Sequence, residues 1–170
     1  MAQATRERVV TEAGKLGDLY ERHAPDAVRL AYLVTGDRAL AEDITQDAFV
    51  RMFGRFRDLR RPEAFHWYLR RTVVNLARSH FRHQRVEREY VEREGHGPPV
   101  DPPPGPEDRD AMWTALGTLT GRQRAAIVLR YYEDLTEAET AEVLGCRLGT
   151  VKSLVSRGLA RLREEMGRDD

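Results

Sequence analysis

A proline-rich segment divides the chain into two helical parts. Residues 95–106 read GHGPPVDPPPGP, and prolines at this density remove helical N–H donors and clash with the preceding turn. We expect an extended, semi-stiff linker here. On both sides apolar residues recur with helical spacing, without alternating β-branched runs or hairpin dipeptides. The sequence therefore predicts an all-α fold of two small helical domains, residues 15–88 and 108–166, joined by a Pro/Gly-rich linker over 89–107.

The carboxy-terminal part contains two short helices joined by a tight turn. Gly145 ends the first helix, because glycine adopts the left-handed conformation that closes a last turn at no Cβ cost. The second helix begins at Gly149 or Thr150. In the first helix the apolar positions follow the spacing of one buried face; they are Leu135, Ala138, Ala141, and also Val143 and Leu144. In the second helix the buried side is formed by Val151, Leu154, Val155, Leu159 and Leu162.

The two helices differ in charge. Residues 133–142 contain acids and no base, whereas residues 147–163 contain no acid. Cations and hydroxyls that can reach phosphates and base edges occupy the other side of the second helix; they are Lys152, Ser153, Ser156, Arg157 and Arg161. This pattern is typical of a helix-turn-helix that presents its second helix to the DNA major groove. The alternative is a solvated amphipathic helix in an ordinary helical bundle.

The amino-terminal part contains a basic strip with interleaved aromatics, residues 62–85, PEAFHWYLRRTVVNLARSHFRHQR. Such interleaving suits single-stranded DNA, because unpaired bases stack on aromatic faces while cations follow the backbone. Trp67 is the aromatic that we expect at the surface. The alternative role is core packing, which we expect for at least half of the apolar residues Phe65, Tyr68, Leu69 and Val73.

Several function classes are disfavoured by composition. The chain has 28 basic and 28 acidic residues and one cysteine, Cys146. A disulfide and a cysteine-based zinc site are therefore ruled out within the chain. We find no P-loop, catalytic triad or metal-ligand cluster, and so expect no enzyme activity, cofactor or metal. Without a signal-peptide core or an apolar stretch long enough to span a bilayer, the protein should be cytoplasmic, with no membrane insertion.

Three segments together resemble a known family. AEDITQDAFVRMF resembles region 2.2 of the extracytoplasmic-function (ECF) sigma factors, and FHWYLRRTVVNLARSHFR resembles regions 2.3 and 2.4. Region 4 of this family is resembled by the stretch LGTLTGRQRAAIVLRYYEDLTEAETAEVLGCRLGTVKSLVSRGLARLR. Its sequence is most similar to that of the actinobacterial SigE-like subgroup. These are promoter-recognition subunits of bacterial RNA polymerase, and the resemblance covers nearly the whole chain.

The resemblance implies specific partners and residues. The partners are core RNA polymerase, through the β′ clamp helices and the β flap, and single- and double-stranded promoter DNA. The sequence leaves open whether an anti-sigma factor also binds. Core binding falls to Asp43, Gln46 and Asp47, which share one helix face. Minus-10 DNA binding falls to Trp67, Arg71, Asn75, Arg78 and Arg82. Asn75 would capture a flipped base, because its amide offers a donor and an acceptor; a buried or capping asparagine is the alternative. Minus-35 binding falls to the basic face of the second helix, residues 152–161.

A second function remains open at this point. A two-domain transcription regulator would carry the same helix-turn-helix and use the amino-terminal part to sense a ligand or partner. A sensing module should offer a receiver-type α/β fold or an apolar ligand pocket. The helical basic strip favours the sigma interpretation, and it also permits a third one, a helical single-strand binder.

Overall fold

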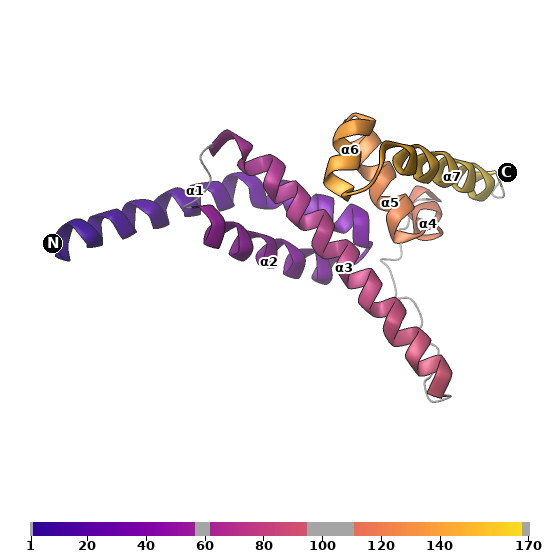
Figure 1. The fold of residues 1–170 in the computed structure, drawn as a ribbon, viewed down its shortest axis with the longest axis horizontal. Coiled ribbons are helices and arrows are strands. Elements are labelled where there is room, and N and C mark those ends of the chain that lie inside the picture. The colour runs from indigo at the N-terminus through magenta and orange to yellow at the C-terminus, as the bar shows by residue number, and fades with distance from the viewer. Residues whose placement is uncertain (1, 57–61, 95–110, 168–170) are drawn as a thin grey trace.

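The computed structural model describes residues 2–56, 62–94 and 111–167, and side chains within 14–55, 63–83 and 113–167. Every regular element in these ranges is a helix (Figure 1), which confirms the predicted all-α class. The linker residues 95–107 lie outside the described residues.

The amino-terminal part is a bundle of three long helices with a short 3-10 turn. Pro25 lies inside the first helix, where its exposed position lets the preceding turn lose one hydrogen bond without burying the orphaned carbonyl. This helix begins at Ala2, before the predicted start of the first domain at residue 15. The last helix of the bundle continues to Glu94, so residues 89–94, assigned above to the linker, are helical. The elements are α1 (Ala2–Thr35), α2 (Arg38–Phe56), η1 (Pro62–Ala64) and α3 (Phe65–Glu94).

The turn between α1 and α2 is set by two consecutive residues. Gly36 has φ of +76°, a left-handed conformation that glycine adopts without strain. Its N–H donates to the Tyr32 carbonyl over 2.7 Å, which closes α1. The Asp37 carboxylate then accepts the Leu40 N–H at 3.0 Å and so caps the first turn of α2. These contacts fold α2 back against α1.

The carboxy-terminal part is built from shorter, well-capped elements. Thr120 and Thr136 each form a capping box at the start of a helix. Gly145, at φ of +60°, closes the first helix of the helix-turn-helix, as predicted. The second helix begins at Leu148, before the predicted start at Gly149 or Thr150. The elements are α4 (Ala111–Gly117), α5 (Gly121–Ile127), the π-helical turn η2 (Val128–Tyr132), α6 (Glu137–Leu144) and α7 (Leu148–Met166).

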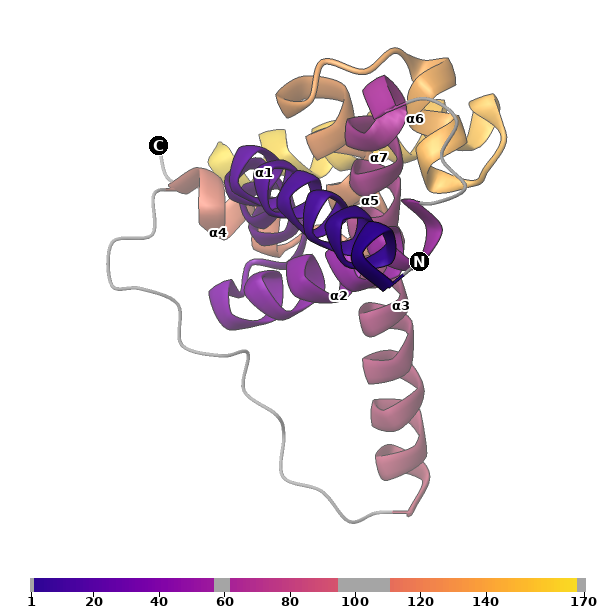
Figure 2. The same cartoon turned by 90° about the vertical axis from the view of Figure 1, so that its left-hand side faces the viewer.

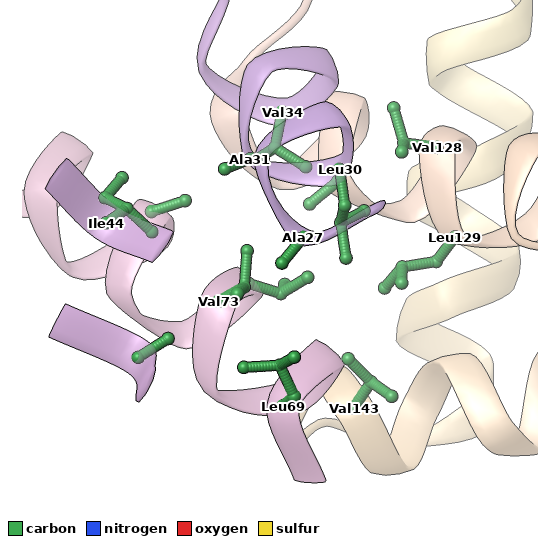
Figure 3. Packing of buried hydrophobic residues seen from close by; sticks show 14 of the residues in the cluster. Ala27, Leu30, Ala31, Val34, Ile44, Leu69, Val73, Val128, Leu129 and Val143 are labelled. Carbon is green, nitrogen blue, oxygen red and sulfur yellow. The ribbon is translucent and has the colours of Figure 1, made fainter. Parts of the chain in front are cut away.

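The two parts share one hydrophobic core. Leu30 of α1 and Val73 of α3 belong to the same buried cluster as Leu129 of η2 and Val143 of α6 (Figure 3). A smaller cluster lies within the carboxy-terminal part, around Leu116, Ile127 and Leu162. Figures 1 and 2 show α4–α7 against one flank of the α1–α3 bundle, with the end of α3 extending beyond both parts. The sequence did not predict this direct packing.

Among the described residues, no helix combines the length and hydrophobicity that a membrane crossing requires.

Candidate nucleic-acid interface

One side of α7 gathers the residues predicted to contact duplex DNA. Side chains on this side are all exposed; they are Lys152, Ser153, Ser156, Arg157 and Arg161. Val151 and Leu162 on the opposite side are buried, while Leu154 and Leu159 are half-buried. Residues spaced by four positions lie on one helix face, so the structure brings the predicted set together on an open surface.

The helix that precedes α7 positions this surface. Thr136 and Glu139 cap α6 reciprocally: the Thr136 hydroxyl accepts the Glu139 N–H, and Glu139 accepts the Thr136 N–H. The Thr136 N–H, followed by the Thr136 hydroxyl, donates to the Glu139 carboxylate and lowers its pKa, because both bonds favour the charged form. Ala138, predicted to be buried, is exposed. Ala141, Val143 and Leu144 are buried as predicted, together with Thr140.

The basic strip of α3 divides between core and surface. Phe65, Leu69 and Val73 are buried, as expected for at least half of its apolar residues. The expectation that Trp67 lies at the surface is wrong: it is half-buried and packs against the main core. Its ring lies 6.0 Å from the Arg70 guanidinium carbon, within reach of a cation–π contact. Tyr68 is instead the exposed aromatic, at 45%.

The polar residues of the strip differ in their exposure to solvent. Asn75 and Arg82 are exposed, which excludes the alternative of a buried asparagine, while Arg71 and Arg78 are half-buried. The Arg78 guanidinium donates to the Leu144 carbonyl in α6. Burial lowers the pKa of Arg78, and the positive charges of Arg122 and Arg82 lower it further. One of the five predicted minus-10 residues is therefore held by the other part of the chain in this arrangement.

A large cavity adjoins Asn75 between the two parts of the chain. Its volume is about 1240 Å³. Sequence reasoning missed three of its arginines, Arg51 and Arg55 on α2 and Arg122 on α5. The i, i+4 spacing of the α2 pair could have indicated a shared face, but nothing in the sequence places Arg122 beside them. The lining residues are Arg51, Met52, Arg55, Thr72, Asn75, Leu76, Arg78, Ser79, Phe81, Arg82, Thr120, Gly121 and Arg122.

A separate surface on α2 carries the residues predicted to bind core polymerase. Asp43, Gln46 and Asp47 are all exposed, while Ile44 between them is buried. Val50, which follows on the same helix face, is 68% exposed and was not predicted.

Two arginines connect the parts: Arg124 is buried and Arg70 is nearly buried. Arg70 Nε of α3 lies 2.6 Å from the Glu133 carboxylate that follows η2, and both side chains are nearly buried. Arg124 Nε of α5 donates to the Leu33 carbonyl of α1 over 2.7 Å, and its guanidinium carbon lies 5.4 Å from the Trp113 ring centroid. Buried charges need such partners. These contacts fix the carboxy-terminal helices on the α1–α3 bundle.

Family models match both parts of the chain. The model described as Sigma-70 region 2 matches residues 19–87. The model described as Sigma-70, region 4 matches residues 109–162. The first match occupies the stretch where a transcription regulator would carry a sensing module, so it removes that alternative.

Similar proteins cover most of the chain. The RNA polymerase sigma-E factor of Streptomyces coelicolor is 35% identical over 148 residues, which cover 86% of this chain and 84% of the relative. The ECF RNA polymerase sigma factor SigE of Mycolicibacterium smegmatis is 33% identical over 158 residues, 89% of this chain and 61% of the relative.

A solved structure has the same fold. The sigma factor RpoE of Bartonella quintana, in complex with the anti-sigma factor NepR, superposes with a TM-score of 0.69 at 24% identity, covering 92% of this chain and 99% of that chain. The exposed basic helix, the arginine-rich strip, the two matching regions and these relatives lead to one conclusion: the chain belongs to the ECF group of the sigma-70 family, non-enzymatic factors that direct promoter recognition by RNA polymerase.

Proposed function

We propose that the chain divides promoter recognition between its two domains, with residues 15–88 reading the minus-10 element and residues 108–166 reading the minus-35 element. The observation that carries this proposal is the presence of two separate DNA-compatible surfaces on one chain: the exposed basic face of α7 and the Asn75-centred side of α3. The segment between Glu94 of α3 and Ala111 of α4 joins the two domains and so limits the distance that the two surfaces can span.

Region 4 recognises duplex DNA through α7. Lys152 and Arg157 reach guanine acceptors or phosphates, and the small side chains of Ser153 and Ser156 allow the helix to approach the groove closely. Arg161, one turn further along, positions the helix on a phosphate. Contact with Glu137 does not oppose this role, because the Lys152 Nζ–Glu137 Oε2 distance is 3.7 Å at an exposed site, where ion pairs are weak.

Region 2 captures unpaired bases. Asn75 reads the edge of a base flipped out of the stack, since its exposed amide has both a donor and an acceptor. Arg71, Arg78 and Arg82 hold phosphates, and Trp67 supports the surface from its half-buried position. Capturing flipped bases offsets part of the few kcal/mol that unstacking costs, so strand opening needs no ATP.

Core polymerase binds through α2. Asp43, Gln46 and Asp47 present an acidic and amide face to the β′ clamp helices, while region 4 contacts the β flap. An anti-sigma factor is the third proposed partner, because the RpoE of Bartonella quintana was solved with one bound. All these interactions place the protein in the cytoplasm.

The two domains must separate for these interactions to form. We call the packed arrangement of the structure closed, and the arrangement with separated domains open. In the structure region 4 packs against α3, and the Leu144 carbonyl accepts one N–H of Arg78, so region 4 must separate from α3 before the minus-10 strand binds fully. Core polymerase supplies the surfaces that hold the domains apart. The free chain should therefore bind promoter DNA weakly.

The test is binding of the purified chain to core polymerase and to promoter DNA. We expect binding to core at low salt, and tight promoter binding by the complex but not by the chain alone. A chain that fails to bind core at low salt would refute the proposal. Tight promoter binding by the chain alone at physiological salt would refute the need for opening.

A further inference from the structure

The cavity between the domains concentrates positive charge. Among the residues that the structure describes, its wall contains five arginines and no aspartate or glutamate. Two arginines come from α2, two from α3, and Arg122 comes from α5 in the other domain. Like charges brought together repel, and an anion in the cavity would remove that repulsion.

The repulsion arises across the domain interface. Burial, followed by the charge of Arg122 and then that of Arg82, disfavours the charged form of Arg78 and lowers its pKa. The Leu144 carbonyl compensates Arg78 in part, because its dipole accepts one N–H. Arg122 belongs to region 4, so its charge joins the α3 arginines only when the domains are packed together. Closing the chain therefore assembles the full anion site.

The remaining lining suits an aromatic base beside the phosphates. Asn75 is exposed and offers a donor and an acceptor. Phe81 lies against Gly121 so closely that a Cβ at position 121 would be 2.8 Å from the Phe81 ring. The ring thus closes the cavity at the junction of α3 and α5. Thr72, Ser79 and Thr120 add hydroxyl groups to the wall.

We propose that this cavity binds a nucleoside polyphosphate in the closed chain, with phosphates on Arg78, Arg82 and Arg122 and the base beside Phe81 and Asn75. The volume of about 1240 Å³ is large enough for such a ligand, since small-molecule pockets commonly measure about 300–1,000 Å³. An acidic peptide would satisfy the arginines but leave the amide and the aromatic ring without a matching partner.

The ligand has a regulatory consequence, which rests on the proposed function. Asn75, Arg78 and Arg82 are also the residues assigned to the minus-10 strand, so nucleotide and strand exclude each other. Because both domains contribute to the wall, the ligand favours the closed chain over the open one. Nucleotide binding would therefore lower the fraction of the chain that is open and able to bind polymerase.

The test measures fluorescence anisotropy of N-methylanthraniloyl-GTP with the full chain at low salt. We expect saturable binding that weakens as salt increases. Arg122→Ala should weaken it about tenfold, the loss of one charge-assisted phosphate contact, and Arg122→Lys should restore part of it. The matched control is Arg163→Ala, an exposed arginine of the same domain outside the cavity, which should bind like the natural chain.

Competition experiments distinguish the contribution of the base to binding from that of the phosphates. Unlabelled GTP should displace the probe at lower concentration than tripolyphosphate, and guanosine should displace it least. Equal displacement by tripolyphosphate and GTP would overturn the assignment of the base to Phe81 and Asn75. Stronger displacement by a poly-glutamate peptide than by GTP would overturn the choice of a nucleotide.

Two further results would overturn the inference without affecting the proposed function. One is the absence of probe binding in a chain that supports run-off transcription with core polymerase. The other is unchanged binding by Arg122→Ala, which would show that region 4 contributes nothing to the site. Circular dichroism of each variant checks that the helices are intact, and run-off transcription by Arg122→Ala with core should match that of the natural chain.

Discussion

The buried ion pair between Arg70 and Glu133 makes the packing of the two domains testable. Arg70 Nε and Glu133 Oε2 are 2.6 Å apart, and the side chains are 13% and 12% exposed. Glu133→Gln keeps the size of the side chain but removes the counter-charge of Arg70. Breaking a buried pair in this way costs about 3–5 kcal/mol. The small remaining exposure and the acceptor oxygen of glutamine place the expected cost near the lower limit.

A loss of about 3 kcal/mol shifts the equilibrium between closed and open chains roughly 100-fold toward the open form. Energy transfer between dyes on cysteines that replace Glu21 in α1 and Glu164 in α7 reports this shift. Both positions are exposed, and a Cys146→Ala background removes the natural thiol. We expect lower transfer efficiency and a smaller free energy of unfolding in Glu133→Gln.

The matched control removes an exposed pair. Arg38 and Glu42 form an i, i+4 pair whose side chains are 85% and 53% exposed, so Arg38→Gln should change stability by less than about 0.5 kcal/mol. The double variant Arg70→Gln/Glu133→Gln completes a thermodynamic cycle. A coupling energy below about 0.5 kcal/mol, or unchanged energy transfer in Glu133→Gln, would refute the reasoning that this pair holds the domains together.

Four further predictions concern the proposed surfaces and the core. Arg157→Ala should cost about 1–3 kcal/mol in duplex binding and relax the preference at one minus-35 position; equal weakening on all sequences, measured by competition titration, would assign Arg157 to phosphate. Asn75→Ala should impair opening of the minus-10 element, followed by permanganate reactivity of unpaired thymines, while minus-35 binding by the holoenzyme stays intact. Asp47→Lys should weaken binding to core polymerase at least about tenfold, whereas the charge reversal Glu21→Lys on α1 should not. Burial, followed by His66 and Arg22, lowers the pKa of His23 below its ordinary value of 6.5, against a smaller opposing effect of Asp26; the free energy of unfolding should therefore fall as pH drops below about 6.5, and urea titrations across that range should show a weaker pH dependence in His23→Gln.

The helices were predictable because local signals define them. The αL glycine at Gly145 ended α6 where the sequence placed it, and the apolar face of α7 agreed with its periodicity. Helix starts were less predictable: α7 begins after Arg147, which makes no side-chain capping bond, so no capping residue marks the position. Pro25 within α1 shows that a proline at an exposed position need not end a helix.

The contacts between the domains could not be predicted from the sequence. Arg70 and Glu133 are 63 residues apart, and Arg124 and Leu33 are 91 apart, so periodicity within either helix carries no information about them. The same contacts explain why Trp67 is half-buried, since it packs against the core that both domains share. Amphipathic analysis indicates which face of a helix is buried but not which partner covers it.

The division of labour between α3 and α7 is the central claim, and sequencing of transcripts initiated in vitro by core polymerase with this chain tests it most directly. We predict discrete start sites that share two upstream elements, with Arg157→Ala changing the sequence selected at the minus-35 element and Asn75→Ala the sequence selected at the minus-10 element. Discrete starts whose two elements respond to the opposite variants, or no starts above those of core alone, would contradict the account.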